Sequence, residues 1–167
     1  IRKRPETQAM SILIDTITMA KKYVERSEIP QDVIDKLIEL YWPGALTIIL
    51  KSKDTVPSLV RGGGETVGIR IPNHKTTRAL IRGVGVGILG PSANFHGEKT
   101  PYKYEDLNPE LVKLVDYVVL GECQIGRAST VIDCSQKPWK VVREGAIVVR
   151  KKVIVSIDTS NNRHAIV

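Results

Sequence analysis

The chain has few aromatic residues and few cysteines. Phenylalanine, tryptophan and tyrosine together make up 5% of its 167 residues, which argues against a surface built to stack the bases of single-stranded nucleic acid. The two cysteines, Cys123 and Cys134, form no C-x-x-C pair and have no metal-ligand spacing with any histidine. We therefore expect unpaired thiols, as in a reducing compartment, and no protein-bound metal.

Long apolar runs are also missing. No stretch approaches the ~20 apolar residues that cross a bilayer, and no signal peptide is apparent, so we expect a cytoplasmic protein without membrane contact. Hydrophobic residues (42%) and charged residues (26%) occur in the proportions of a soluble globular domain. The first residue is Ile1 rather than methionine, which indicates a piece of a longer protein.

Positive charge is concentrated in one block of the sequence. The formal net charge is +7, and residues 51–100 hold eight Lys or Arg against three Asp or Glu. Residues 1–50 and residues 101–150 each balance at seven against seven. This surplus suggests an anionic partner such as a nucleotide or RNA, with an ordinary solvated basic surface as the alternative.

Hydrophobic periodicity predicts alternating helices and strands in the first half of the chain and mostly strands in the second. We expect helices at 15–24, from Pro30 to Pro43-Gly44, at 76–82 and in the later half of 102–115. Strands are expected at 11–14, 46–50, 67–71, 85–89, 117–120, 130–132 and 140–142. This order predicts an α/β fold with a mixed twisted sheet and flanking helices.

A glycine pattern, Gly85-x-Gly87-x-x-Gly90, matches the spacing of a dinucleotide-binding fingerprint. That fingerprint needs a strand before it and a helix after it. Here the expected helix comes first and a loop follows, so we reject the dinucleotide reading. The glycines are better explained by a strand that packs closely against its neighbours.

Three short segments carry chemistry suited to phosphate. The first places three cations directly before Pro5. The second ends a strand with a hydroxyl and an amide two residues apart, and the third pairs a serine at a strand start with an arginine at a strand end. Taken singly, each segment has an ordinary structural explanation: the first as a solvated terminus, the second as a turn, and the third as residues that are common at strand ends. The candidates are Arg2, Lys3, Arg4, Ser92, Asn94, Ser129 and Arg143.

Taken together, six ordered segments resemble one family, the YrdC-type L-threonylcarbamoyladenylate synthases. That family carries K-x-R-P, W-P-G-x-L-T, T-V-x-x-R-x-P, P-S-A-N-x-x-G, S-T-V-[VI]-D and [LV]-R-x-G in this order. The present sequence reads R-K-R-P at 2–5, W-P-G-A-L-T at 42–47 and T-V-G-I-R-I-P at 66–72. It continues with P-S-A-N-F-H-G at 91–97, S-T-V-I-D at 129–133 and V-R-E-G at 142–145.

The resemblance implies an open α/β fold with a concave basic face where ATP, L-threonine and bicarbonate meet. Threonine's amine is carboxylated, and the new carboxylate attacks the α-phosphate of ATP with release of pyrophosphate. ATP is then a substrate that brings Mg²⁺ with it, and the product serves threonylcarbamoyladenosine modification of tRNA. The partners implied are downstream threonylcarbamoyl transferase proteins and a contact with tRNA or double-stranded RNA.

The resemblance also implies roles for individual residues. Arg2 and Arg4 take the paired cationic positions that hold the triphosphate, and Ser92 with Asn94 forms the S-x-N pair that hydrogen-bonds phosphates. Ser129 lies near the reacting centre as the catalytic candidate, and Arg143 closes on the phosphates. Arg2 departs from the family, which has lysine there, and so exchanges a compact ammonium for a planar fork.

The ends of the chain depart from the family as well. Residues 1–149 are expected to form the synthase domain without its N-terminal segment, whose P-T-[DE]-T-x-Y-G-L motif supplies much of the threonine pocket. We expect this piece alone to be inactive. Residues 150–167 are expected to be a linker and a hairpin. The hairpin either packs on the synthase sheet or begins a second domain, because its I-D-T-S string resembles the start of TsaB-like actin-type ATPase folds.

Two other functions are compatible with the motifs. One is a carbamoyl-adenylate-forming enzyme of the hydrogenase-maturation type, which contains a YrdC-like domain downstream of other segments. The other is a non-catalytic RNA-binding module that uses the same basic concavity, for which tRNA binding would depend strongly on salt.

Overall fold

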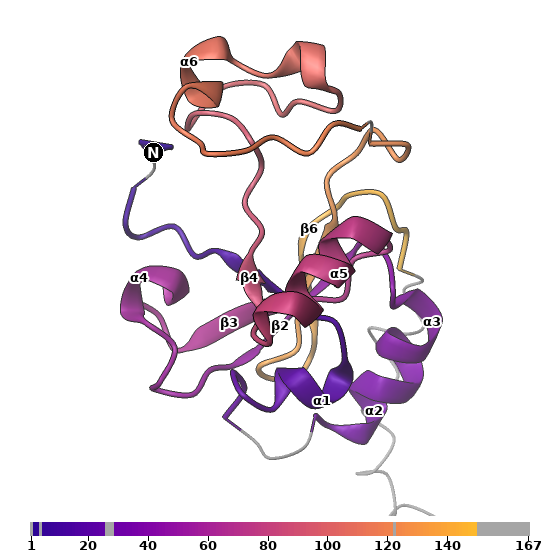
Figure 1. Ribbon diagram of the computed structural model, residues 1–167. Helices are drawn as coiled ribbons and strands as arrows, with labels where there is room; N and C mark the ends of the chain where they lie inside the picture. The colour runs from indigo at the N-terminus through magenta and orange to yellow at the C-terminus, as the bar shows by residue number, and fades with distance from the viewer. Residues whose placement is uncertain (1, 4, 26–28, 122, 150–167) are drawn as a thin grey trace, which may run out of the picture.

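The computed structural model describes residues 2–3, 5–25, 29–121 and 123–149. Its centre is a six-stranded sheet in the order β4-β1-β3-β2-β5-β6 (Figure 1). Two neighbouring pairs, β1 with β3 and β2 with β5, are parallel, and the other three pairs are antiparallel. The strands are β1 Ser11–Leu13, β2 Leu46–Lys51, β3 Thr66–Arg70, β4 Ile88–Leu89, β5 Thr130–Asp133 and β6 Lys140–Arg143. This mixed sheet with flanking helices confirms the predicted fold class.

The helices are short, apart from two. The helix expected from Pro30 to Pro43 runs as one continuous unit with a π-helical middle, made of α2 Gln31–Val33, η1 Ile34–Ile38 and α3 Glu39–Tyr41. The other long helix, α5 Lys75–Val84, ends at Gly85 in the left-handed conformation (φ 77°). The remaining elements are α1 Ile17–Ala20, α4 Ser58–Arg61, the 3-10 turn η2 Tyr104–Asp106 and α6 Pro109–Val112.

One face of the sheet carries the apolar core. Alternate strand residues such as Ile12, Ile48, Ile69 and Ile132 are at most 4% exposed, as expected where one face of a sheet is buried. They pack in one cluster with residues of α1, α2 and η1, including Leu37. Burial of each such side chain contributes about 1.5–3 kcal/mol, which fixes the register of the strands.

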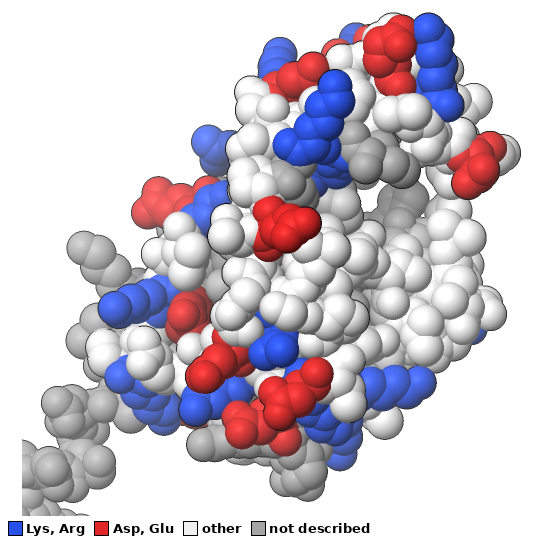
Figure 2. Space-filling view, turned by 90° about the vertical axis from the view of Figure 1, so that its left-hand side faces the viewer, with Lys and Arg blue, Asp and Glu red and all other residues white. Residues whose placement is uncertain are grey.

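The opposite side of the sheet holds α5 and an upper lobe formed by residues 91–128. In Figure 1, α1 and α2 lie on one side of the strands, and α5 and α6 lie on the other. The buried residues of α5 and α6, Ile81 and Leu111, are outside the main core cluster. Figure 2 shows the surface hollowed between the lobe and the body, with positive and negative side chains interspersed over the face in view.

Several predicted elements need correction. The helix expected at 15–24 has only the turn α1, and Thr16 rather than Asp15 is its N-cap, accepting a hydrogen bond from the Met19 amide. The carboxylate of Asp15 instead pairs with two arginines of α5. The strand expected at 85–89 is restricted to Ile88–Leu89, because Gly85 caps α5.

The upper lobe also differs from the prediction. The helix expected in 102–115 is the single turn α6, preceded by η2. The strand expected at 117–120 is wrong, since these residues join no sheet in the described chain and Tyr117 and Leu120 are 82% and 73% exposed. An apolar run therefore does not predict a strand by itself, because a strand also needs a neighbouring strand to pair with. The turn α4 had no prediction.

The glycine pattern of 85–90 has the structural role that was expected. A Cβ at Gly87 would lie 2.6 Å from the Ile12 side chain, and one at Gly90 would lie 2.5 Å from the Leu13 side chain. Both neighbours belong to β1, which pairs with β4. The glycines therefore allow β4 to lie close against β1, and the rejection of the dinucleotide fingerprint is confirmed by the helix that precedes it.

Asp15 joins the end of β1 to α5. Its carboxylate accepts hydrogen bonds from Arg78 (2.6 Å) and Arg82 (3.0 Å), and the Asp15 side chain is 6% exposed. The hydrogen bond from Arg78 lowers the pKa of Asp15 below its ordinary value of 3.8, against the opposing effect of burial, with Arg82 adding to the lowering. The ionised carboxylate is therefore favoured by the folded state.

We expect the Asp15→Asn variant to be less stable than the wild type at neutral pH. Its free energy of unfolding should also decrease less than that of the wild type as the pH falls into the acid range. Because the folded-state pKa is lowered, Asp15 stabilises the protein above pH 3.8 and loses this contribution as the pH falls through its folded pKa. Urea unfolding between pH 7 and pH 2.5 measures the difference. Asp116→Asn, at an exposed position, is the control. Parallel pH curves for wild type and Asp15→Asn would contradict the assignment.

Both cysteines are free, with Cys134 buried and Cys123 exposed, which confirms the expected unpaired thiols. Within the described residues, no helix has both the length and the apolarity that a membrane span requires. The expected linker and hairpin at 150–167 lie outside the described residues, as does Arg4.

Candidate functional site

Arg2 binds the loop that follows β4. Its Nε donates to the Asn94 carbonyl (2.8 Å), and its Nη2 donates to Ser92 Oγ and Asn94 Oδ1 (both 3.1 Å). The His96 amide donates in return to the Arg2 carbonyl (2.9 Å), and the Lys3 ammonium lies 5.2 Å from the centre of the Phe95 ring. The structure thus brings Arg2, Ser92 and Asn94 into one polar group, which we call the loop cluster.

Asn94 is the best-fixed member of the loop cluster. It is 7% exposed, and its Nδ2 donates to the Glu98 carbonyl (2.6 Å). Glu98 in turn accepts hydrogen bonds from the Phe95 amide and from Asn108 Nδ2. The fork of Arg2 uses two nitrogens on this loop at once, a geometry that the ammonium of a lysine cannot reproduce.

Ser129 and Arg143 form a second group at the start of β5, which we call the strand cluster. Arg143 donates from Nε and Nη2 to the Ser129 carbonyl (3.1 and 2.8 Å) and from Nη2 to Ser129 Oγ (3.0 Å). Ser129 Oγ lies 2.9 Å from Thr47 Oγ1 on β2, and both residues are buried. The serine hydroxyl is therefore held between an arginine and a threonine.

A second guanidinium, that of Arg70, belongs to the same end of the sheet. Its Nε donates to the Gly44 carbonyl (2.7 Å), and no described acidic residue pairs with it. Burial lowers the pKa of Arg70, the negative charge of an ionised Cys123 opposes this, and the Arg143 guanidinium lowers the pKa further. Two guanidiniums that repel each other without a carboxylate between them make a place where an anion is stabilised.

A row of small and hydroxyl residues crosses the sheet between the two clusters. A Cβ at Gly68 would lie 3.2 Å from Thr47 Cγ2 and 3.3 Å from Ser11 Oγ, so Ser11, Gly68 and Thr47 share one face of β1, β3 and β2. This face is opposite to the apolar core, because side chains alternate along each strand. Thr47 continues the row to Ser129 through their hydrogen bond. The row ends near the loop cluster, since the Gly90 amide donates to the Ser11 carbonyl (2.9 Å).

The predicted site residues are thus found in two clusters rather than one contact network. The loop cluster follows β4 and the strand cluster precedes β5, and in the described chain no hydrogen bond joins them. Because β4 and β5 are separated by β1, β3 and β2, these two strands lie roughly 20 Å apart at ~4.8 Å per strand. A ligand that contacts both clusters must extend across the row. Arg4 lies outside the described residues.

Sequence reasoning assigned no role to Arg70, Thr47, Ser11 or Gly68. Arg70 and Thr47 lie inside two of the quoted segments, and each is a polar residue in a mostly apolar strand. That position was a usable signal, because a strand with one face in the core places its polar residues together on the other face. Ser11 and Gly68 carried no such signal, since their neighbours are known only from the strand order.

Among the described residues, no group of three or more His, Cys, Asp or Glu side chains could hold a metal ion. The polar groups of the two clusters are cations, hydroxyls and amides, which bind phosphate or carboxylate oxygens rather than metals.

Comparison with protein families gives one match that covers most of the chain. The Sua5/YciO/YrdC family model, described as telomere recombination, matches residues 1–145. A putative threonylcarbamoyl-AMP synthase of Methanocaldococcus jannaschii is 32% identical over 152 residues, which is 90% of this chain and 69% of that protein. The threonylcarbamoyl-AMP synthase of Bacillus subtilis is 41% identical over 116 residues, 66% of this chain and 33% of that protein.

Solved structures of related proteins share the fold. The Pyrococcus abyssi Sua5 protein in complex with L-threonine superposes with a TM-score of 0.74 at 31% identity, over 86% of this chain and 42% of that one. Escherichia coli YciO gives a TM-score of 0.72 at 25% identity, over 93% of this chain and 73% of that one. The chain therefore spans less than half the length of the Bacillus and Pyrococcus relatives.

Proposed function

The chain belongs to the Sua5/YciO/YrdC family, and we propose that it forms most of the catalytic domain of an L-threonylcarbamoyladenylate synthase. The protein would join L-threonine, bicarbonate and ATP into threonylcarbamoyl-AMP and release pyrophosphate. The product would pass to threonylcarbamoyl transferase proteins that modify tRNA. The Bacillus and Pyrococcus relatives that carry the name threonylcarbamoyl-AMP synthase support this proposal.

The observation that carries the proposal is the pair of guanidiniums beside Ser129. Arg143 contacts the serine carbonyl and hydroxyl. The half-buried Arg70 lies near enough to Arg143 that the Arg143 guanidinium lowers the pKa of Arg70. Joining a carbamate to an α-phosphate brings two anions together, so their mutual repulsion must be offset by fixed positive charge. Two arginines with no carboxylate partner in the described chain suit that task.

Each cluster has a distinct role in the proposal. The loop cluster of Arg2, Ser92 and Asn94 holds the β- and γ-phosphates, Arg4 contributes a further positive charge to the triphosphate, and Mg²⁺ arrives on the triphosphate. Arg143 contacts the α-phosphate, and Ser129 hydrogen-bonds at the reacting centre. Arg70 holds a further anionic group there, either the threonine carboxylate or a phosphate oxygen.

The reaction asks the protein for positioning rather than for covalent chemistry. The carbamate oxygen forms a bond to the α-phosphorus while the bond from that phosphorus to the bridging oxygen breaks, and pyrophosphate leaves with both bond electrons. Holding the carbamate and the triphosphate in line turns a bimolecular encounter into a unimolecular step. The row between the clusters supports this role with its hydroxyl groups, since Ser11 and Thr47 meet over Gly68, where a larger side chain would crowd both.

The test is pyrophosphate release by the intact polypeptide that contains this chain. We expect release that requires ATP, L-threonine and bicarbonate together, with formation of threonylcarbamoyl-AMP detected by mass spectrometry. A parallel reaction with carbamoyl phosphate in place of threonine and bicarbonate tests for carbamoyl-adenylate formation. Activity only in that second reaction, or tRNA binding without any adenylate, would overturn the proposal.

A further inference from the structure

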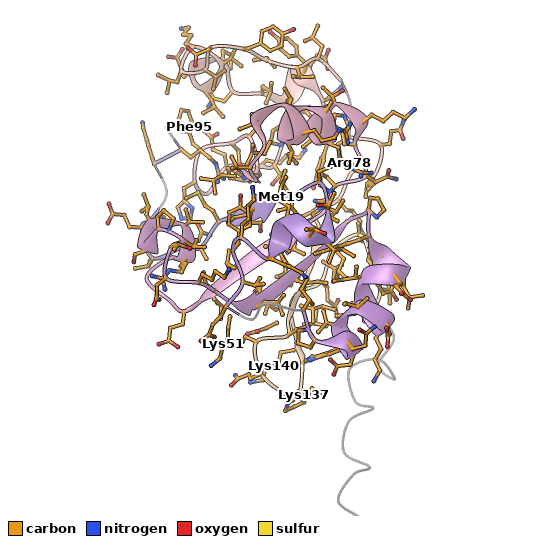
Figure 3. All side chains as sticks on the ribbon, turned by 60° about the horizontal axis from the view of Figure 1, so that its bottom comes forward. Met19, Lys51, Arg78, Phe95, Lys137 and Lys140 are labelled. Carbon is orange, nitrogen blue, oxygen red and sulfur yellow. The ribbon has the colours of Figure 1, made fainter. Side chains whose placement is uncertain are left out.

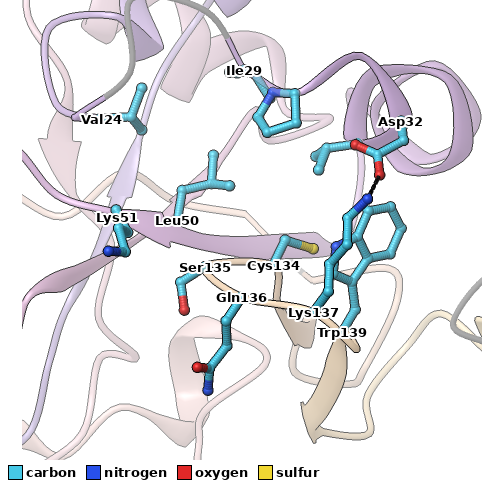
Figure 4. Close-up of a pocket in the computed structure, with 12 residues that line it drawn as sticks. Val24, Ile29, Asp32, Leu50, Lys51, Cys134, Ser135, Gln136, Lys137 and Trp139 are labelled. Atoms are coloured by element: carbon cyan, nitrogen blue, oxygen red, sulfur yellow. Dashed lines mark ion pairs between the residues drawn. The ribbon is translucent and has the colours of Figure 1, made fainter. Parts of the chain in front are cut away.

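A separate cavity of about 280 Å³ lies between α2, the end of β2 and the segment after β5 (Figure 4). It is at the far end of β5 from Ser129, because β5 begins after Ser129 and the cavity is lined from Cys134 onward. The strand cluster therefore does not reach it. We call it the β5 cavity.

The floor of the β5 cavity is apolar. Its lining includes Val33, Leu50, Cys134 and Trp139, which are 1–7% exposed. Burial raises the pKa of the Cys134 thiol to about 12, with smaller contributions from the carboxylates of Asp133 and Asp32. The thiol is therefore uncharged at neutral pH, and the interior suits an apolar group.

The mouth of the cavity is polar and contains one compensated charge pair. Lys137 Nζ lies 2.6 Å from Asp32 Oδ2, so the single acidic side chain of the lining is neutralised. Ser135 and Gln136 add a hydroxyl and an amide. Figure 4 shows this ion pair at one end of the cavity and Lys51 at the other.

Lys51 is the second cation of the lining. Among the described residues, no ion pair joins the Lys51 ammonium, and its side chain is exposed. Figure 3 shows Lys51, Lys137 and Lys140 along the same edge of the molecule. With Asp32 paired to Lys137, Lys51 is the one charged lining residue for which the described part of the chain shows no partner.

We propose that the β5 cavity binds a small amphipathic carboxylate, with an aromatic ring or branched aliphatic body inside and the carboxylate beside Lys51. The size fits, because a cavity of ~150 Å³ accepts benzene, and the β5 cavity leaves additional room for a short acidic arm. A nucleoside triphosphate is too large and too polar for this cavity. The site is independent of the synthase reaction.

The test uses the two tryptophans of the chain, of which Trp139 lines the cavity and Trp42 does not. The protein is labelled with 5-fluorotryptophan, and the two ¹⁹F signals are assigned with Trp42→Phe or Trp139→Phe. Phenylacetate is titrated as the probe, with phenylacetamide as its uncharged counterpart. We expect the Trp139 signal to shift and saturate with a dissociation constant on the order of 1 mM, while the Trp42 signal stays in place.

The charge preference is tested with matched lysine variants. Phenylacetate should bind up to about fivefold more tightly than phenylacetamide, the scale of an exposed ion pair. This preference should vanish in Lys51→Gln and persist in Lys113→Gln, which alters an exposed lysine of the upper lobe. A Trp139 signal that does not move overturns the proposal, as does equal binding of acid and amide in the wild type. A preference that survives in Lys51→Gln also overturns it.

Discussion

Replacing Arg143 with alanine should weaken ATP binding by the intact protein about 10- to 150-fold, or ~1.5–3 kcal/mol, the scale of a hydrogen bond to a charged group. The side chain is the donor that holds the Ser129 carbonyl and hydroxyl. Its loss removes a positive charge and also releases the serine. Equilibrium dialysis with ATP measures the affinity, and pyrophosphate release measures the reaction.

Two further variants separate charge from geometry. Arg143→Lys keeps the charge but loses the fork that reaches two acceptors, so we expect an intermediate loss of affinity. Arg127→Ala removes an exposed arginine from the segment that leads into β5. Arg127 lines a separate pocket together with Tyr102 and Glu144. Its ATP affinity should stay within twofold of the wild type. Equal losses for Arg127→Ala and Arg143→Ala would point to general electrostatics instead of a contact.

Much of the fold could be predicted from the sequence because the strands of the sheet have strong local signals. Residues 46–50 and 67–71 are apolar runs bounded by turn residues, and they correspond to the central strands β2 and β3. Residues 117–120 have a similar composition yet lie in an exposed, irregular segment. The difference is the presence of neighbouring strands, and local composition carries no information about that.

The site was predictable only in part for a related reason. The resemblance singled out Ser129 and Arg143, and the structure shows that they are in contact. It also singled out Arg2, Ser92 and Asn94, which are in contact with one another. The row that runs between these clusters depends on the strand order, which places Ser11 beside Gly68 and Gly68 beside Thr47. No property of those three residues taken singly marks them as neighbours.

Gly145 fixes the strand cluster through the space that its missing side chain leaves. A Cβ there would lie 2.5 Å from the carbonyl carbon of Ser129 and 2.6 Å from its oxygen, and would also collide with the Ala128 oxygen. These are backbone atoms, so they cannot turn aside as a flexible side chain could. The Ala146 amide donates to the Ala128 carbonyl (2.9 Å) directly after this contact. Gly145 therefore allows the segment after β6 to lie against the residues that precede β5.

The Gly145→Ala variant should be destabilised by about 1–3 kcal/mol, the cost of overpacking a close contact. It should also lose most of its pyrophosphate release, because the forced separation moves Ser129 away from Arg143. Urea unfolding and the pyrophosphate assay at a temperature where the variant is folded measure the two effects separately.

Gly83→Ala is the matched control. Gly83 lies inside α5, and an added Cβ would meet no atom within 4 Å outside its own helix turn, so alanine there should stabilise the protein by about 0.5–1 kcal/mol and leave activity unchanged. Full activity in a folded Gly145→Ala protein would show that the contact between β6 and the start of β5 does not position Ser129.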